Sequence, residues 1–164
     1  FAASSSDDFL LNFGARGDFT AKLSGFVRFG MVDRSLDNGG GRTTFNMSSN
    51  VKYQYSEKTS LTAGVGNDLG NSGVGENQEN FDMSLGFRSE MTPDFAMTGR
   101  ISYRQIDYFS RGEDQYIQGS LGGEYTVNEY FKVAGLYNYK NNDGDLASGD
   151  FDNNIFSITA KLRY

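Results

Sequence analysis

The feature that most constrains this chain is a regular alternation of apolar and polar residues, which is clearest at its end. From residue 155 to residue 164, every second side chain is apolar: Phe156, Ile158, Ala160, Leu162 and Tyr164. Serine, threonine, lysine and arginine occupy the positions between them. Successive side chains of a β-strand point to opposite faces. The segment therefore predicts a strand with one apolar face and one polar, basic face.

Earlier segments repeat this period, so the sequence predicts nine strands in all. The other eight segments span residues 9–19, 23–34, 44–55, 61–66, 81–90, 95–104, 117–127 and 131–140. Most of them are long enough to match the roughly 9–11 residues that a tilted strand needs to cross a bilayer. The pattern predicts an all-β fold, a transmembrane antiparallel up-and-down β-barrel or part of one.

The connections between these segments alternate in length. Short turns fall at residues 21–22, 56–59, 92–94 and 128–130, and longer stretches rich in Gly, Asn and Asp fall at 36–42, 70–79, 110–114 and 141–154. Outer-membrane barrels have short periplasmic turns and longer external loops. The alternation predicts a bacterial outer-membrane protein with its C-terminus on the periplasmic side.

Composition supports a membrane-embedded sheet. Hydrophobic residues make up only 37% of the chain, but aromatic residues make up 15%. This combination suits a barrel, which needs one apolar face and aromatic girdles at both membrane interfaces. No apolar run reaches the roughly 20 residues of a membrane-spanning helix. The length of 164 residues predicts one domain, 1–164.

Two questions about the architecture stay open. A soluble antiparallel sheet or sandwich also alternates, although its strands are usually nearer five or six residues long. Nine is also an unusual count, because bacterial single-chain barrels have an even number of strands. Three explanations remain. The chain is the C-terminal part of a larger barrel whose N-terminal portion is missing, or it is a complete barrel of eight or ten strands, or its nine strands close through a parallel pair of the first and last strands. The polar start from Ser4 to Asp8 resembles an external loop and favours the first.

The alternation also separates the charges. Most cations fall on the polar face, which is predicted to line the lumen: Arg16, Arg28, Arg34, Lys52, Arg88, Arg100, Arg104, Lys132, Lys140, Lys161 and Arg163. The acids predicted to join them are Asp18, Asp68, Asp82, Glu90 and Glu124. Acids predicted in extracellular loops include Glu76, Glu79, Asp143, Asp145, Asp150 and Asp152, and Glu113 and Asp114 are placed in a loop as well. Residues predicted to face the membrane include Phe81, Met83, Leu85, Phe87, Phe156, Ile158, Leu162 and Tyr164.

A basic lumen has two interpretations. It can be a water-filled conduit that favours anionic solutes or an anionic polymer. Alternatively, internal ion pairs hold a small barrel shut. Because the predicted cations outnumber the predicted acids on this face by about two to one, pairing cannot be complete within the chain.

Several functions are disfavoured. The chain has no Cys and no His, which removes the usual nucleophile–base pairs and the commonest metal ligands. We therefore predict no enzyme activity, no cofactor and no metal. The net charge of −6 argues against nucleic acid as a partner. The tripeptide Arg16-Gly17-Asp18 is explained by chance, and the acidic stretch from Asn141 to Asp145 lacks the spacing of an EF-hand loop.

The last part of the chain resembles a known family. Three of its segments, Ser102–Tyr108, Asp114–Gly119 and Gly123–Asn128, occur in a familiar order, followed by Tyr137–Lys140, Asp150–Asn154 and the terminal strand. Residues 80–164 resemble the end of the beta-barrel porin 2 (BBP2-like) group of outer-membrane proteins, some of which are linked to exopolysaccharide export. The resemblance implies a pore or export conduit and carries over no catalytic residue.

The leading prediction is a passive porin-like or polysaccharide-export channel in a Gram-negative outer membrane. Its surroundings would be outer-membrane lipid and lipopolysaccharide, and its cargo an anionic solute or polysaccharide. The competing prediction is a non-conducting structural or adhesion barrel, whose acidic external loops bind a partner or divalent ions.

Overall fold

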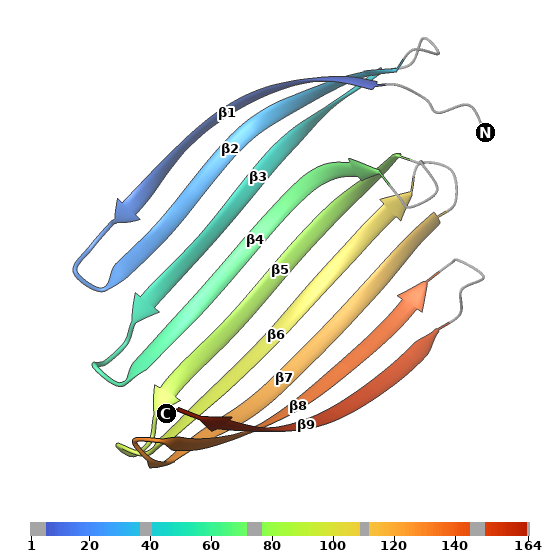
Figure 1. Ribbon diagram of the computed structural model, residues 1–164. Helices are drawn as coiled ribbons and strands as arrows, with labels where there is room; N and C mark the ends of the chain where they lie inside the picture. Colours follow the sequence, from blue (N-terminus) through green and yellow to red (C-terminus); the bar gives the residue numbers. More distant parts are fainter. Residues whose placement is uncertain (1–5, 37–40, 72–76, 109–111, 145–149, 164) are drawn as a thin grey trace.

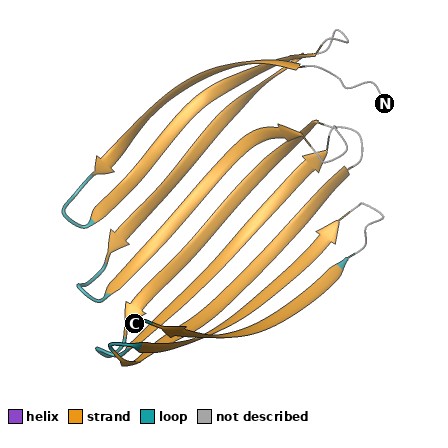
Figure 2. Cartoon of the chain, in the orientation of Figure 1, coloured by secondary structure: helices purple, strands orange, loops and turns teal. Residues whose placement is uncertain are grey.

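The chain forms one all-β sheet in the computed structural model, which describes residues 6–36, 41–71, 77–108, 112–144 and 150–163. These residues contain no helix (Figure 2). The nine strands are β1 (Ser6–Asp18), β2 (Leu23–Leu36), β3 (Gly41–Gln54), β4 (Thr59–Asn71), β5 (Asn77–Glu90), β6 (Phe95–Tyr108), β7 (Gly112–Asn128), β8 (Phe131–Gly144) and β9 (Phe151–Leu162). The predicted number of strands is therefore confirmed.

The topology is the simplest that nine strands can take. Each strand lies antiparallel to the one before it, and the spatial order is the sequence order from β1 to β9. The sheet is curved, and β1 and β9 run in the same direction, toward the end that carries the short turns (Figure 1). Within the described residues, β1 and β9 are each paired on one side only, so the sheet is open.

The strands are longer than the alternation alone predicts. They contain 12 to 17 residues because the antiparallel ladders continue into the Gly- and Asn-rich stretches that were predicted as loops. Glu79, Asp143 and Asp152, predicted in extracellular loops, lie in strands β5, β8 and β9, and Glu113 and Asp114 lie in β7. Of the predicted long loops, residues 37–40, 72–76, 110–111 and 145–149 lie outside the described residues, and Asp150 lies just before β9.

The short turns repeat one local design. At Thr20, Ser56 and Thr92, the side-chain hydroxyl accepts hydrogen bonds from the backbone N–H groups two and three residues later. At Asn128, the side-chain oxygen accepts from the N–H of Tyr130. These four residues are evenly spaced, each 36 residues after the one before. Ser, Thr and Asn favour turns through such side-chain bonds to the backbone. The hairpin is therefore a repeating unit of this fold.

The register gives the sheet two different faces. Even-numbered residues of β1–β8 and odd-numbered residues of β9 share the polar face. One cross-strand row on this face consists of Gly14, Arg28, Ser48, Gly66, Asp82, Arg104, Tyr116, Asn142 and Phe151. The opposite face is apolar and strongly exposed, with Phe156 at 82% and Ile158 at 85%. No second sheet covers this face in the described part of the chain. Exposing such a large apolar surface to water costs free energy, whereas contact with lipid does not.

Candidate functional site

The polar face is the concave side of the curved sheet. The buried residues Gly30, Val32, Arg34, Asp114 and Asn142 all belong to it, whereas the large exposed hydrophobic residues lie mainly on the opposite face. Side chains on a concave surface converge and bury one another, which explains this distribution. We refer to the two surfaces as the concave polar face and the convex apolar face.

The middle of the concave polar face is floored by small residues. On strands β3 to β7, the residues of this face include Ser48, Thr62, Gly64, Gly66, Ser84, Gly86, Ser102 and Ser120. A hollow of about 450 Å³ lies over part of this floor, and Arg100, Arg104 and Gln118 contribute to its border. Barrel interiors that are closed are filled by side chains. Small side chains here leave open space.

Some of the predicted lumen cations are held in ion pairs. Arg104 Nε lies 2.6 Å from Asp82 Oδ1 on the neighbouring strand. Glu124 lies between two lysines, 3.5 Å from Lys132 Nζ and 3.4 Å from Lys161 Nζ. Arg34 is paired with Asp8 at 2.7 Å. These cations fit the second interpretation of the basic lumen, in which internal ion pairs hold the wall together, because each one links neighbouring or nearby strands.

Other cations on the same face have no carboxylate partner within the described residues. They are Arg16, Arg28, Lys52, Arg88 and Arg100. Arg100 donates a hydrogen bond of 3.0 Å from Nη2 to Ser84 Oγ, which fixes its guanidinium over the small-residue floor. Lys140 lies over two rings, 4.8 Å from the centroid of Tyr116 and 5.3 Å from that of Phe151. Positive charge is therefore available to a solute along much of this face.

The charge balance differs from the sequence prediction. Asp8 and Asp114 also lie on the concave polar face. Asp114 was predicted in a loop, and β7 extends far enough to include it. Among side chains that the structure describes in the strands, ten cations face seven carboxylates, which leaves a net charge of +3. The excess is positive but smaller than predicted.

The remaining predicted site residues fall into three groups. On the convex apolar face lie Phe81, Met83, Leu85, Phe87, Phe156, Ile158 and Leu162. Glu79, Asp143 and Asp152 occupy the same face at the strand ends with the longer connections, and Asp150 immediately precedes β9. Arg163 follows the last residue of β9, and Glu76, Asp145 and Tyr164 lie outside the described residues.

No helix in the described ranges is long and apolar enough to cross a membrane. A curved meander of long antiparallel strands, polar on its concave side and apolar on its convex side, defines the wall of an outer-membrane β-barrel. The chain matches the family described as "Putative beta-barrel porin 2" over residues 2–164, and it belongs to that family.

Solved structures with the same fold include outer-membrane proteins. The outer membrane channel DcaP of Acinetobacter baumannii is 14% identical with a TM-score of 0.71, over 99% of this chain and 54% of that one. A loop L8 deletion mutant of OmpT from Vibrio cholerae is 14% identical with a TM-score of 0.62, over 96% of this chain and 53% of that one. The FrpB iron transporter of Neisseria meningitidis is 12% identical with a TM-score of 0.68, over 98% of this chain and 31% of that one.

These similarities concern the fold. The chain spans about half the length of DcaP and of the OmpT mutant. A search of curated protein sequences gives no significant match.

Proposed function

We propose that the chain forms about half of the wall of a passive outer-membrane channel, whose water-filled lumen is lined by the concave polar face and favours anions. The observation that carries the proposal is the small-residue floor bordered by cations that have no carboxylate partner among the described residues, such as Arg28, Arg88 and Arg100. Charged groups of this kind are costly in lipid and need water or a polar ligand. The proposal contains no catalytic step.

The strand count supports a wide barrel. Nine strands account for 54% of the length of a matched channel. Strands spread evenly over such a length would number about 16 to 18, a size at which barrels leave an aqueous channel. Because β1 and β9 run in the same direction, an odd number of further strands is needed to close the wall with antiparallel pairs only. We propose that an N-terminal portion supplies these strands.

We propose an orientation in the membrane from the lengths of the connections. The connections 19–22, 55–58, 91–94 and 129–130 are short and lie at one end of the sheet. In outer-membrane barrels the short turns are periplasmic. We therefore place this end, and the C-terminus with it, on the periplasmic side. Lipopolysaccharide would surround the opposite end.

The cargo we favour is a small anionic solute, and an anionic polysaccharide is a larger candidate. The specific observation in favour of a polysaccharide is the group formed by Lys140, Tyr116 and Phe151 on the concave polar face. Aromatic rings pack against sugar rings, and an ammonium group pairs with their acidic substituents. An acidic oligosaccharide that reduces conductance from one side would support this cargo, and loss of the effect in Lys140→Gln would locate it.

A non-conducting structural barrel is the second candidate function. On the convex apolar face, the register sets Glu79 opposite Asp107 and Asp107 opposite Glu113. Carboxylates directly opposite one another destabilise a sheet unless cations lie between them. The described residues contain no group of three or more carboxylates placed to hold a metal ion by themselves, so in this candidate lipopolysaccharide phosphates would supply the remaining ligands of a divalent ion. A barrel of this kind would lose thermal stability on chelation and would not conduct.

Conductance tests the proposal most simply. The intact barrel, purified from outer membranes and inserted in a planar bilayer, should conduct and should prefer anions in a salt gradient. A folded barrel that inserts without conducting would refute the channel and leave the structural candidate.

A further inference from the structure

The contact between β3 and β4 is the weakest in the sheet. Their ladder contains eight register pairs, from Gln54 opposite Ser60 to Met47 opposite Asn67. Each of the other seven ladders contains between 12 and 14 pairs. Residues 41–46 of β3 stay paired with β2, and residues 68–71 of β4 stay paired with β5. The two strands diverge toward the end with the longer connections (Figure 1).

A side chain closes the last paired position of this ladder. Asn67 Oδ1 accepts a hydrogen bond of 2.7 Å from the N–H of Met47, and Asn67 Nδ2 donates one of 2.7 Å to the carbonyl of Phe45. The amide of Asn67 thus replaces a peptide group of β4. The side-chain oxygen of the adjacent Asn46 is buried and has no hydrogen-bond partner within the described ranges. The β3–β4 ladder therefore stops at one hydrogen-bonded position, Met47 with Asn67, and does not weaken gradually along the strands. We refer to the unpaired region beyond this position as the break.

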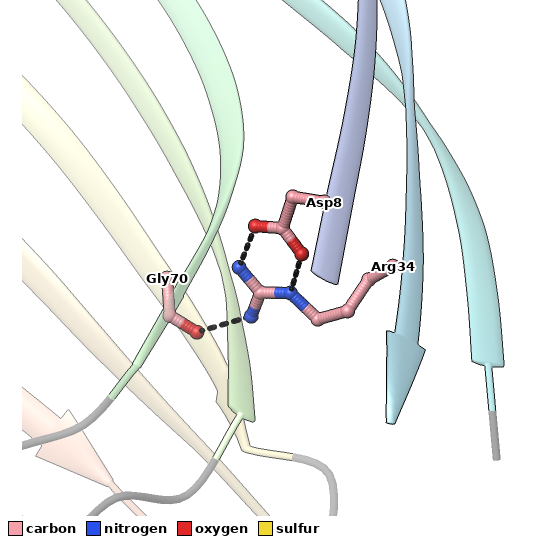
Figure 3. Close-up of polar contacts among 3 residues, drawn as sticks. All are labelled: Asp8, Arg34 and Gly70. Atoms are coloured by element: carbon pink, nitrogen blue, oxygen red, sulfur yellow. Dashed lines mark hydrogen bonds and ion pairs between the residues drawn. The ribbon is translucent and has the colours of Figure 1, made fainter. Parts of the chain in front are cut away.

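A second contact joins the two parts of the sheet beyond the break. Arg34 of β2 donates from Nε to Asp8 Oδ1 and from Nη2 to Asp8 Oδ2, both at 2.7 Å. Its Nη1 donates to the carbonyl of Gly70 on β4 at 3.4 Å (Figure 3). Arg34 is 7% exposed, the least of any cation that the structure describes. One guanidinium therefore connects β1, β2 and β4.

We propose that β1–β3 is a flap that turns on the short β3–β4 ladder, and that the Asp8–Arg34–Gly70 contact is the latch that holds it. The flap is a stable unit, because β1 and β2, and β2 and β3, are each joined by 13 register pairs. The hinge lies near the periplasmic turn at residues 55–58, and the end of the flap that moves away from β4 is the external end, where β3 and β4 are not paired.

The flap gives the wall two arrangements. With the latch made, the concave polar face of β2 is held against β4. With the latch broken, β2 and β4 separate and this side of the barrel widens. Resting on the proposed channel, the inference predicts a second, larger conductance level. It makes no assumption about the preferred ion.

Hydrogen exchange of the intact barrel tests the flap without conductance. Arg34→Met removes the donors of the latch and keeps an apolar side chain of similar length. We expect the N–H of Met47, which donates to Asn67 at the end of the β3–β4 ladder, to exchange at least tenfold faster in this variant, with no change in β5–β8. Arg104→Met is the matched control, since Arg104 also pairs with a register partner, Asp82, and makes no hydrogen bond or ion pair to a third strand within the described residues. Equal exchange in the two variants would overturn the latch.

A cysteine pair tests the break while the latch stays intact. The chain contains no Cys, so two introduced thiols are the only ones it supplies. Asn46→Cys with Asp68→Cys would be opposed if the ladder continued, and Ser48→Cys with Gly66→Cys are opposed within it. We expect the second pair to form a disulfide readily and the first pair to form it much more slowly. Equal rates would refute the break.

Conductance then separates this inference from the proposed function. Arg34→Met should add a larger conductance level that wild type visits rarely, and Arg34→Lys should lie between them. Anion-selective conductance without any change in level would refute the gate and leave the channel. Faster exchange in a barrel that never conducts would leave the flap and refute the channel.

Discussion

Reversing two cations of the concave polar face should reverse the ion preference of the channel. Arg88→Glu with Arg100→Glu changes residues that have no carboxylate partner in the described part of the chain, so no ion pair is broken. The net charge of the face falls by four, from +3 to −1.

The size of the effect follows from Coulomb's law. One unit charge about 10 Å from an ion in water contributes about 0.4 kcal/mol, and screening at 0.1 M salt lowers this to about 0.15 kcal/mol. A change of four units then shifts the balance between an anion and a cation by about 1.2 kcal/mol, or about eightfold in permeability ratio.

The assay is the reversal potential of single channels in a salt gradient, which should change sign in the double variant. The control carries the same change in charge on two short turns: Lys22→Glu with Lys58→Glu. This control should alter the ratio by less than about twofold, because its charges lie at the edge of the wall, where screening is stronger. Equal shifts in both variants would refute the assignment of the concave polar face to the lumen.

Two further predictions concern stability, measured as the urea midpoint of unfolding. Gly99→Ala should lower stability by about 1–3 kcal/mol, because its Cβ would overlap the ring of Phe87 on the facing strand, whereas Gly119→Ala has open space and should have little effect. Glu124→Gln should cost about 0.5 kcal/mol, since it releases two partly exposed lysines of β8 and β9. Glu90→Gln should be neutral, because Glu90 makes no ion pair in the part of the chain that the structure describes.

The strand number and the face of each residue could be predicted because the two-residue period is local. In β5 and β9, for instance, the apolar residues from Phe81 to Phe87 and from Phe156 to Leu162 alternate with polar residues or glycine without exception. The strand ends could not be predicted. Glu79 and Asp143 sit among Asn and Gly residues that are equally common in loops, and only pairing with a neighbouring strand makes them extended.

The division of the cations also needed the structure. Arg34 and Asp8 are 26 residues apart in sequence, and only the register brings them together. The residues next to Arg34 and Arg28 in the sequence do not reveal that Arg34 is buried and bonded to Asp8 and Gly70, whereas Arg28 is exposed to solvent. The turns, in contrast, could have been located more accurately from the sequence. Thr20 and its equivalents, whose side chains bond to the turn backbone, recur every 36 residues, and the alternation of apolar and polar residues does not capture this repeat.

The central claim is that one face of this sheet meets water and the other meets lipid. Single cysteines at neighbouring positions test this claim most directly. Ser84 faces Ser102 on the concave polar face, and Leu85 faces Ile101 on the convex apolar face. In the membrane-embedded barrel, cysteines at Ser84 and Ser102 should react with a water-soluble thiol reagent, and cysteines at Leu85 and Ile101 should react only with a lipid-soluble one. Equal reaction of all four with the water-soluble reagent would contradict the account.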